Sequence, residues 1–409
     1  MTMKAILFPL ILSVLVLFLD SSAHLYGFPG RKKTPASELK APAAGQNNHA
    51  GDQNKQSGNQ KKSDEGQKYL SNEEYFRIMR DFSERPGHYF SSNYSSNESS
   101  YLQVIDEIEK LKIKGGAYIG VGPEQNYTYI AKIRPEIAFI VDIRQDAQLQ
   151  HLMYRALFQI SENRIDFIKN LTCRSPSRIK KDDSLEQSIA LFLHESPPDS
   201  MKFQECFEHI MQTFREEDIS RLSVEEIDRM KSIYRAFALA GLNISFDFRP
   251  NEYHNLGRQI KFHTLILSKT PDGRYENFLA SDENYEAVRK LSFENRIVPI
   301  VGNFSGHHAL RSIAEYLSER RIIVRVFYVS NVEAFLFQQN NDVRNYLENI
   351  YLLPSDVSSY MIRFTSRHDS SRPADSERHE GVTRMEKLQN FTSRQKKAFS
   401  SSYRELLQY

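Results

Sequence analysis

The stretch "GGAYIGVGPEQNYTYIAKIRPEIAFIVDI", residues 115–143, contains two apolar runs joined by a helix-like segment. The first run, "AYIGV", has the length of a short strand, and "PEQNYTYIAKI" follows it as a helix that begins at a proline. The second run, "EIAFIVDI", is apolar on both faces, which is typical of a central strand in a parallel sheet. The stretch therefore predicts a strand–helix–strand crossover.

The same alternation continues along the chain. The segment "AQLQHLMYRALFQI" predicts a helix with one apolar stripe, and the later segments alternate as helix "DENYEAVRKL", strand "RIVPIVGN", helix "GHHALRSIAEYLSER", strand "IIVRVFYVSN" and helix "VEAFLFQQN". We see no repeat with a period of 20–50 residues, which argues against a solenoid or a propeller. We predict an α/β, Rossmann-like fold with a mostly parallel sheet and helices on both faces.

The N-terminus has the pattern of a secretory signal peptide. Lys4 precedes the apolar run "AILFPLILSVLVLFL", and the small residues "DSSAH" follow it, so cleavage after Ala23 is expected. An uncleaved anchor is the alternative, but about 15 apolar residues fall short of the roughly 20 that span a bilayer. We expect an exported protein, periplasmic or secreted, with no stable membrane span after cleavage.

The amino-acid composition divides the rest of the chain into three regions. Residues 24–68 are rich in Gly, Pro, Asn, Gln and Lys and predict a disordered linker. Residues 69–365 predict the α/β domain, with a helical insertion at about 184–242 in which Ser223 and Glu226 form a capping box. Residues 366–409 predict a polar tail with a short helix from about Arg384.

Charge and cysteine content narrow the functional classes. The chain has 54 basic and 52 acidic residues, so its formal charge of +2 does not indicate a nucleic-acid partner. The two cysteines, Cys173 and Cys206, suit either a disulfide in an oxidising compartment or two buried thiols. The candidate ligands Cys206, Glu208 and His209, with His194 and His254, are irregularly spaced and form no known metal motif, so we expect no metal.

A glycine turn follows the first predicted strand, and parallel α/β sheets bind ligands at this end of their strands. Gly120 and Gly122 allow a close approach to the backbone, and Glu124 lies at the start of the next helix, where N–H groups are unpaired. Asp142 ends the second strand 22 residues after Gly120, at a spacing suited to binding ribose hydroxyls. Capping of the following helix is an equally good explanation of Asp142.

Two more strand ends supply candidates. Asn303 and Phe304, in "GNFSG", are placed to read and stack on a base, or else to cap the next helix and pack in the core. Asn331 and Glu333 follow the last predicted strand, where groups that touch reacting atoms commonly lie. Glu333 is a candidate general base if it is desolvated, and a glutamate favoured by the helix dipole otherwise.

The order of these elements resembles the class I S-adenosylmethionine-dependent methyltransferase fold. The segments "YIGVGPEQNYTYIAKIRPEIAFIVDIR", "FLASDENY", "IVPIVGNFSG" and "FYVSNVEAFLF" are similar to an uncharacterised bacterial family with a methyltransferase-like fold, over about residues 69–365. The resemblance implies that Gly120 and Gly122 flank the methionine part of S-adenosylmethionine and that Asp142 binds its ribose. Asn303 stands where an aspartate usually reads the adenine.

Two hypotheses about function follow. The first is methyl transfer from S-adenosylmethionine, with Asn331 or Glu333 near the acceptor. The second is a non-catalytic module that keeps the fold and binds another small, nucleotide-like ligand or a partner, because S-adenosylmethionine is made inside cells and this chain is expected to leave them. Fold alone does not decide between the two hypotheses.

Overall fold

The computed structural model describes residues 70–180, 182–216, 222–248, 259–337, 340–366 and 381–397. These residues form an α/β fold around a six-stranded sheet in the order β3-β2-β1-β4-β5-β6. The strands are β1 (Ala117–Gly120), β2 (Ile137–Asp142), β3 (Ile297–Val301), β4 (Val324–Ser330), β5 (Tyr360–Ser366) and β6 (Gly381–Lys387). The predicted α/β class and the mostly parallel sheet are confirmed.

The parallel or antiparallel pairing of each strand agrees with the burial pattern of its side chains. β1 to β5 pair in parallel, and every residue of β1, β2 and β3 is buried, as the apolar runs predict. β6 pairs antiparallel with β5 and alternates buried and partly exposed residues over its first four positions. An antiparallel edge strand on a parallel sheet is common in α/β folds.

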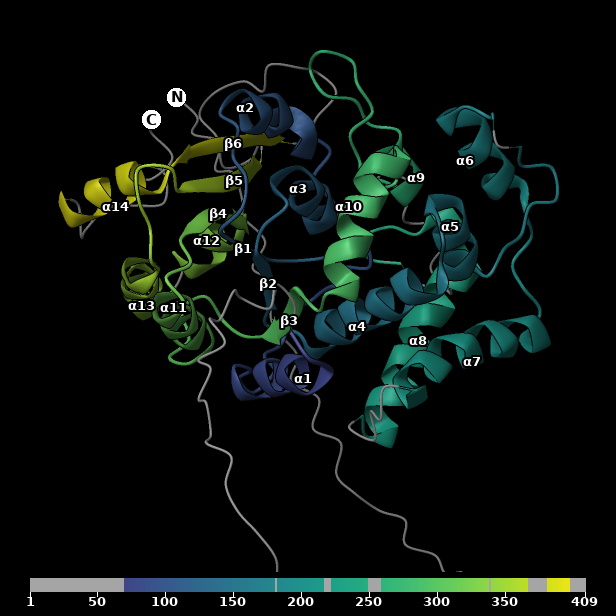
Figure 1. Ribbon diagram of the computed structural model, residues 1–409, viewed down its shortest axis with the longest axis horizontal. Coiled ribbons are helices and arrows are strands. Elements are labelled where there is room, and N and C mark those ends of the chain that lie inside the picture. Colours follow the sequence, from purple (N-terminus) through teal and green to yellow (C-terminus); the bar gives the residue numbers. More distant parts are fainter. Residues whose placement is uncertain are drawn as a thin grey trace, which may run out of the picture. The chain divides into compact units, whose positions relative to one another are not determined.

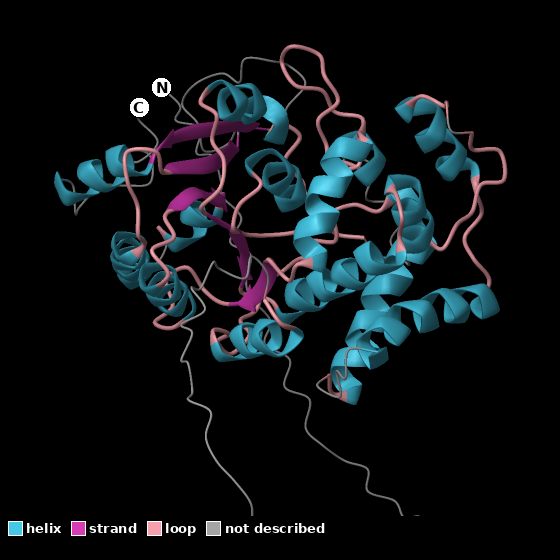
Figure 2. Cartoon of the chain, in the orientation of Figure 1, coloured by secondary structure: helices cyan, strands magenta, loops and turns pink. Residues whose placement is uncertain are grey.

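Helices flank the sheet (Figure 1). On one side lie α2, α3, α4 and α10, and on the other lie α11, α13 and α14, with α1 near the β3 edge. Figure 2 shows the same arrangement, with helices surrounding the strands. The bounds are α1 (Asn72–Asp81), α2 (Ile105–Lys110), α3 (Gln125–Ile133), α4 (Gln145–Ile160), α10 (Asp282–Phe293), α11 (Ala309–Glu319), α13 (Asn340–Leu352) and α14 (Leu388–Lys397).

Further helices pack outside α4. They include α5 (Arg164–Thr172), α6 (Leu185–His194), α7 (Ser200–Glu216) and α8 (Val224–Ala240), and α7 and α8 both contact α4. The predicted capping box at the start of α8 is present, with the Ser223 side chain accepting from the Glu226 N–H. Four short helices complete the described elements: α9 (Phe262–Ile266), α12 (Val332–Leu336) and the 3₁₀ helices η1 (Tyr101–Val104) and η2 (Gly241–Asn243).

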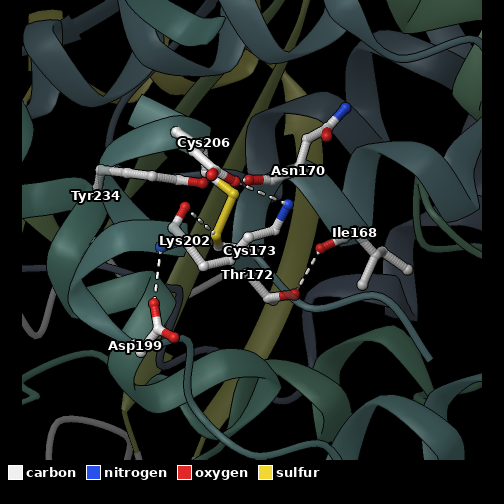
Figure 3. The surroundings of a disulfide bond; sticks show 9 residues. Ile168, Asn170, Thr172, Cys173, Asp199, Lys202, Cys206 and Tyr234 are labelled. Atoms are coloured by element: carbon white, nitrogen blue, oxygen red, sulfur yellow. Dashed lines mark hydrogen bonds and ion pairs between the residues drawn. A yellow bond between two sulfur atoms is a disulfide. The ribbon is translucent and has the colours of Figure 1, made fainter. Parts of the chain in front are cut away.

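A disulfide joins Cys173 to Cys206 (Figure 3). Cys173 ends α5 in the left-handed conformation, and Cys206 lies on α7, so the bond links two helices of the outer layer. Nearby, the Tyr234 hydroxyl of α8 donates to the Asn170 carbonyl of α5 at 2.7 Å. Of the two states left open by the sequence, the structure has the disulfide.

The segment predicted to be a polar tail contributes to the sheet. β6 and α14 both lie after residue 365, and the Tyr360–Lys387 pairing anchors β6 beside β5. The folded region therefore extends past the expected boundary, because alternating side chains in "GVTRMEK" complete the sheet edge. The predicted signal peptide and linker lie outside the described residues, and no helix in the described ranges is long and apolar enough to cross a bilayer.

Candidate functional site

A cavity of about 540 Å³ lies at the carboxyl ends of β1, β2, β3 and β4. Its volume is in the range of small-molecule sites. The sheet-end residues that line it are Val121, Gly122, Pro123, Val141, Asp142, Ile143, Arg144, Gly302, Asn303, Phe304, Tyr328, Ser330 and Asn331. The parallel strands thus bring together the four loops that the sequence marks as informative.

The second wall comes from residues 83–100, which we call the strap. Strap N–H groups donate to the ends of two strands, from Glu84 to the Val301 carbonyl and from Gly87 to the Ile143 carbonyl, both at 2.8 Å. The strap supplies the cavity residues His88, Tyr89, Phe90, Asn93, Ser96, Asn97 and Glu98. Sequence reasoning missed all of them, because the segment has neither helical nor strand periodicity.

The two glycines of the turn after β1, Gly120 and Gly122, have different structural roles. Gly122 has φ +81°, and a Cβ there would meet no atom within 4 Å, so this position is open. Gly120 does not line the cavity, and a Cβ there would lie 2.0 Å from Asn126 Oδ1. The Asn126 amide donates to the carbonyls of Val121 and Pro123 and so fixes the turn.

A buried histidine, His151, forms a hydrogen bond to the same turn. His151 Nε2 lies 3.0 Å from the Gly122 carbonyl oxygen, and Nδ1 lies 2.7 Å from the Tyr127 hydroxyl. Because a carbonyl only accepts, we assign the proton to Nε2, and the Tyr127 hydroxyl then donates to Nδ1. Burial lowers the pKa of His151 to about 4, so the ring is neutral at pH 7.

Asp142 lines the cavity with its carboxylate already bound by Arg144. The Arg144 Nε donates to Oδ1 at 3.1 Å and Nη2 to Oδ2 at 2.9 Å, and both side chains are about nine-tenths buried. The Arg144 backbone N–H also donates to Oδ1, at 3.0 Å. Asp142 therefore orders its own loop, and a ligand would share it with Arg144.

The loop after β3 is ordered by local hydrogen bonds. Asn303 Oδ1 accepts from the N–H and hydroxyl of Ser305, both at 3.0 Å, and Phe304 is buried against Phe327 and Tyr346. The start of α11 is capped from the strap, because Glu84 Oε1 accepts from the His308 and Ala309 N–H groups. Asn303 and Phe304 reach the cavity, but their polar and packing capacity is largely used within the protein.

The two predicted catalytic residues have different places. Asn331 lines the cavity at the start of α12. Glu333 does not line it: its carboxylate is 1% exposed and binds the Tyr346 hydroxyl at 2.9 Å and the Arg363 guanidinium at 2.7 Å. The structure therefore gives Glu333 a place in an interior ion pair, away from the cavity.

Glu98 is a second buried carboxyl that lines the cavity, beside Asp142. Its Oε2 accepts from the Gln125 amide at 2.9 Å, and its Oε1 accepts from the Ser330 hydroxyl. Burial raises the pKa of Glu98, and these hydrogen bonds oppose that shift. Ser330 has φ +52° at an irregularity of β4, and strained backbone of this kind clusters at functional sites.

A comparison with family models places this architecture among known sequences. A model described as "Domain of unknown function (DUF7790)" matches residues 93–408. The chain belongs to this family. The DUF7790 match begins within the strap and includes Glu98, all six strands and α14. A comparison with curated proteins finds no match.

In this DUF7790 protein, Glu124 lies beneath the glycine turn and joins it to the strap. Glu124 Oε1 accepts from the Ser96 N–H at 3.1 Å, whereas Oε2 is buried without a hydrogen-bond partner. Glu124 does not line the cavity. Burial raises the pKa of this carboxyl to about 7.

The pKa of Glu124 predicts how stability depends on pH. The folded protein keeps a proton that the unfolded chain has released, so the free energy of unfolding falls as pH rises from about 4.5 to 7. Glu124→Gln removes this titration. We expect its stability relative to the wild type to increase by about 2–3 kcal/mol between pH 4.5 and 8, measured by urea denaturation. Glu225→Gln, at an exposed carboxyl, is the control, and equal pH profiles for the wild type and Glu124→Gln would contradict the assignment.

Within the described ranges, no group of three or more His, Cys, Asp and Glu side chains comes together as a metal site. His194 and His209, which the sequence offered as partners of Cys206, are on α6 and α7, and Cys206 is taken by the disulfide. His254, the remaining candidate, lies outside the described residues.

Proposed function

We propose that the cavity binds a nucleotide-like small molecule, with S-adenosylmethionine as the best candidate, and that the protein transfers its methyl group to an acceptor. One observation carries the proposal: the cavity lies at the carboxyl ends of the central strands, between the open turn at Gly122 and the acid at Asp142. In open α/β sheets this crevice is where ligands bind.

The charge of the lining supports a sulfonium ligand over a pyrophosphate. Besides two tyrosines, the titratable lining groups are the carboxyls Glu98, Asp142 and Asp342, one arginine and His88, with no lysine among the lining residues. The arginine, Arg144, is bound to Asp142. A pyrophosphate would therefore meet more carboxyls than cations, whereas a positively charged sulfonium is matched by this lining.

Methyl transfer requires positioning and exclusion of water more than acid–base groups. In this proposal the backbone at Gly122 lies against the methionine part of the donor, and Asp142, held by Arg144, faces the ribose. Asn331 lies on the acceptor side. The methyl group passes from the sulfonium to a nucleophilic atom of the acceptor, which leaves S-adenosylhomocysteine and releases one proton to solvent when the acceptor is a hydroxyl or an amine.

A non-catalytic binding module is the second candidate. It is favoured by the Asp142–Arg144 pair, because both carboxylate oxygens already accept hydrogen bonds. In this second candidate the protein is exported, which the Cys173–Cys206 disulfide supports, since disulfides persist in oxidising compartments. An exported protein would meet little S-adenosylmethionine, so the same cavity would then hold a different ligand.

Calorimetry of the full chain tests the proposed donor. We expect S-adenosylmethionine and S-adenosylhomocysteine to bind with micromolar affinity, and Asp142→Asn to weaken both by about tenfold or more. The matched control is Asp356→Asn, which alters another arginine-bound aspartate that lies outside the cavity, where Asp356 accepts from Arg325 at 2.9 Å.

The outcomes separate the two candidates. If neither S-adenosylmethionine nor S-adenosylhomocysteine bound, methyl transfer would be ruled out. Binding of NAD in place of S-adenosylmethionine would refute the argument from charge. Equal weakening by Asp142→Asn and Asp356→Asn would mean that the loss reflects general stability rather than contact with the ligand.

A further inference from the structure

Three aromatic side chains form a cluster at the edge of the cavity, which we call the aromatic rim. Tyr89 and Phe90 come from the strap, and Phe335 comes from α12. The ring centroids are 4.4 Å apart for Tyr89 and Phe90, 6.0 Å for Tyr89 and Phe335, and 6.5 Å for Phe90 and Phe335. Two segments far apart in sequence thus place three rings around one opening.

Two of these rings remain open to solvent, and Tyr89 is partly buried. Phe90 is 66% exposed and Phe335 is 39% exposed, although both are large apolar side chains beside a cavity. Clustered exposed rings of this kind mark binding sites more often than isolated ones do. Among the cation–ring pairs that the described residues form, none involves the aromatic rim, so the chain's own described lysines and arginines do not occupy these faces.

Acidic groups accompany the rim. Glu98 and Asp342 line the same cavity, and the nearby Arg144 is held by Asp142. Aromatic faces carry negative partial charge, and a cation held over them near carboxylates gains from both. A neutral apolar ligand would gain only from the rings, and an anion would be repelled by the acids.

We propose that the aromatic rim binds a positively charged amine, quaternary or protonated, on a ligand that enters the cavity beside the nucleotide-like one. The inference rests on the proposed function in placing this amine on the acceptor side of the same cavity. The acceptor class is therefore a molecule that carries a cationic amine and a separate nucleophilic atom, such as a hydroxyl, because a quaternary or protonated nitrogen has no lone pair with which to take the methyl group. Tyr89, Phe90 and Phe335 contact the ammonium group, and Asp342 supplies the neighbouring negative charge.

The test compares choline with 3,3-dimethylbutan-1-ol, which replaces the charged nitrogen by carbon at nearly the same size. Both are titrated into the full chain, and binding is followed by NMR broadening of the methyl signal. We expect choline to bind at least about tenfold more tightly than the neutral analogue. We expect Phe335→Leu and Phe90→Leu each to weaken choline binding by about tenfold, because each removes one ring face.

Phe293→Leu is the matched control, since Phe293 is a 48% exposed phenylalanine at the end of α10 and outside the cavity. Equal binding of choline and its neutral analogue would overturn the proposal, as would unchanged choline binding in both rim variants. Choline binding without S-adenosylhomocysteine binding would support the rim and reject the proposed donor. Binding of S-adenosylhomocysteine without binding of choline would support the proposed donor and reject an amine site at the aromatic rim.

Discussion

Replacing Glu333 by alanine is expected to lower the free energy of unfolding by about 3–5 kcal/mol, because it removes a carboxylate partner of the buried Arg363. Arg363 is 1% exposed, and its guanidinium binds Glu333 at 2.7 Å and Glu386 at 2.9 Å. Breaking a buried pair costs more than the pair contributes, since the remaining charge stays desolvated. Urea denaturation at pH 7 measures the loss.

Two further variants make this result specific. Glu283→Ala breaks the exposed pair with Arg134, whose side chains are 79% and 52% exposed, and is expected to cost less than about 1 kcal/mol. Glu333→Gln keeps the shape and one acceptor, so its loss should be smaller than that of Glu333→Ala. If Glu333→Gln abolished a methyl-transfer activity while stability stayed unchanged, Glu333 would be catalytic after all.

Removal of the disulfide is expected to have the second large effect. Cys173 and Cys206 are 33 residues apart, and the loop that they close reduces the entropy of the unfolded chain, which corresponds to about 3–4 kcal/mol. The double variant Cys173→Ala/Cys206→Ala should therefore unfold at lower denaturant concentration than the oxidised wild type. Reductant should lower the stability of the wild type by a similar amount and leave the double variant unchanged. Equal stability of the oxidised wild type and the double variant would contradict this expectation.

The central part of the fold could be predicted from the sequence because its signals are local. "AYIGV", "EIAFIVDI" and "RIVPIV" are short apolar runs that become fully buried parallel strands. β6 was missed because "GVTRMEK" is polar at alternate positions, so its sequence pattern predicts a polar segment. The segment is stabilised as a strand by its pairing with β5. Local pattern therefore identified β1 to β4 but missed the parallel strand β5 and the antiparallel edge strand β6.

The site could be predicted only in part, for the same reason. Gly122, Asp142, Asn303 and Asn331 follow strands, and topology brings them to one cavity. Glu98 could not be placed there, because its position depends on contacts with Gln125 and Ser330, the latter 232 residues away. The Arg363 partner of Glu333 is likewise 30 residues downstream, so this ion pair could not be predicted from the helix start.

The spacing of Asp142 and Arg144 is one local signal that sequence reasoning overlooked. An arginine two residues after a strand-terminal aspartate can fold back on it, and here Arg144 does so through its backbone N–H and its guanidinium. Because of this pairing, Asp142 is a weaker candidate for binding a ribose by itself. It also removes the cavity's arginine as a site for phosphate.

The most direct test of the central claim is a crystal structure of the full chain grown with S-adenosylhomocysteine. We expect ligand density in the cavity, with the amino-acid part beside the Gly122 backbone and the ribose facing Asp142. Density elsewhere on the protein, or an empty cavity at a saturating ligand concentration, would contradict it.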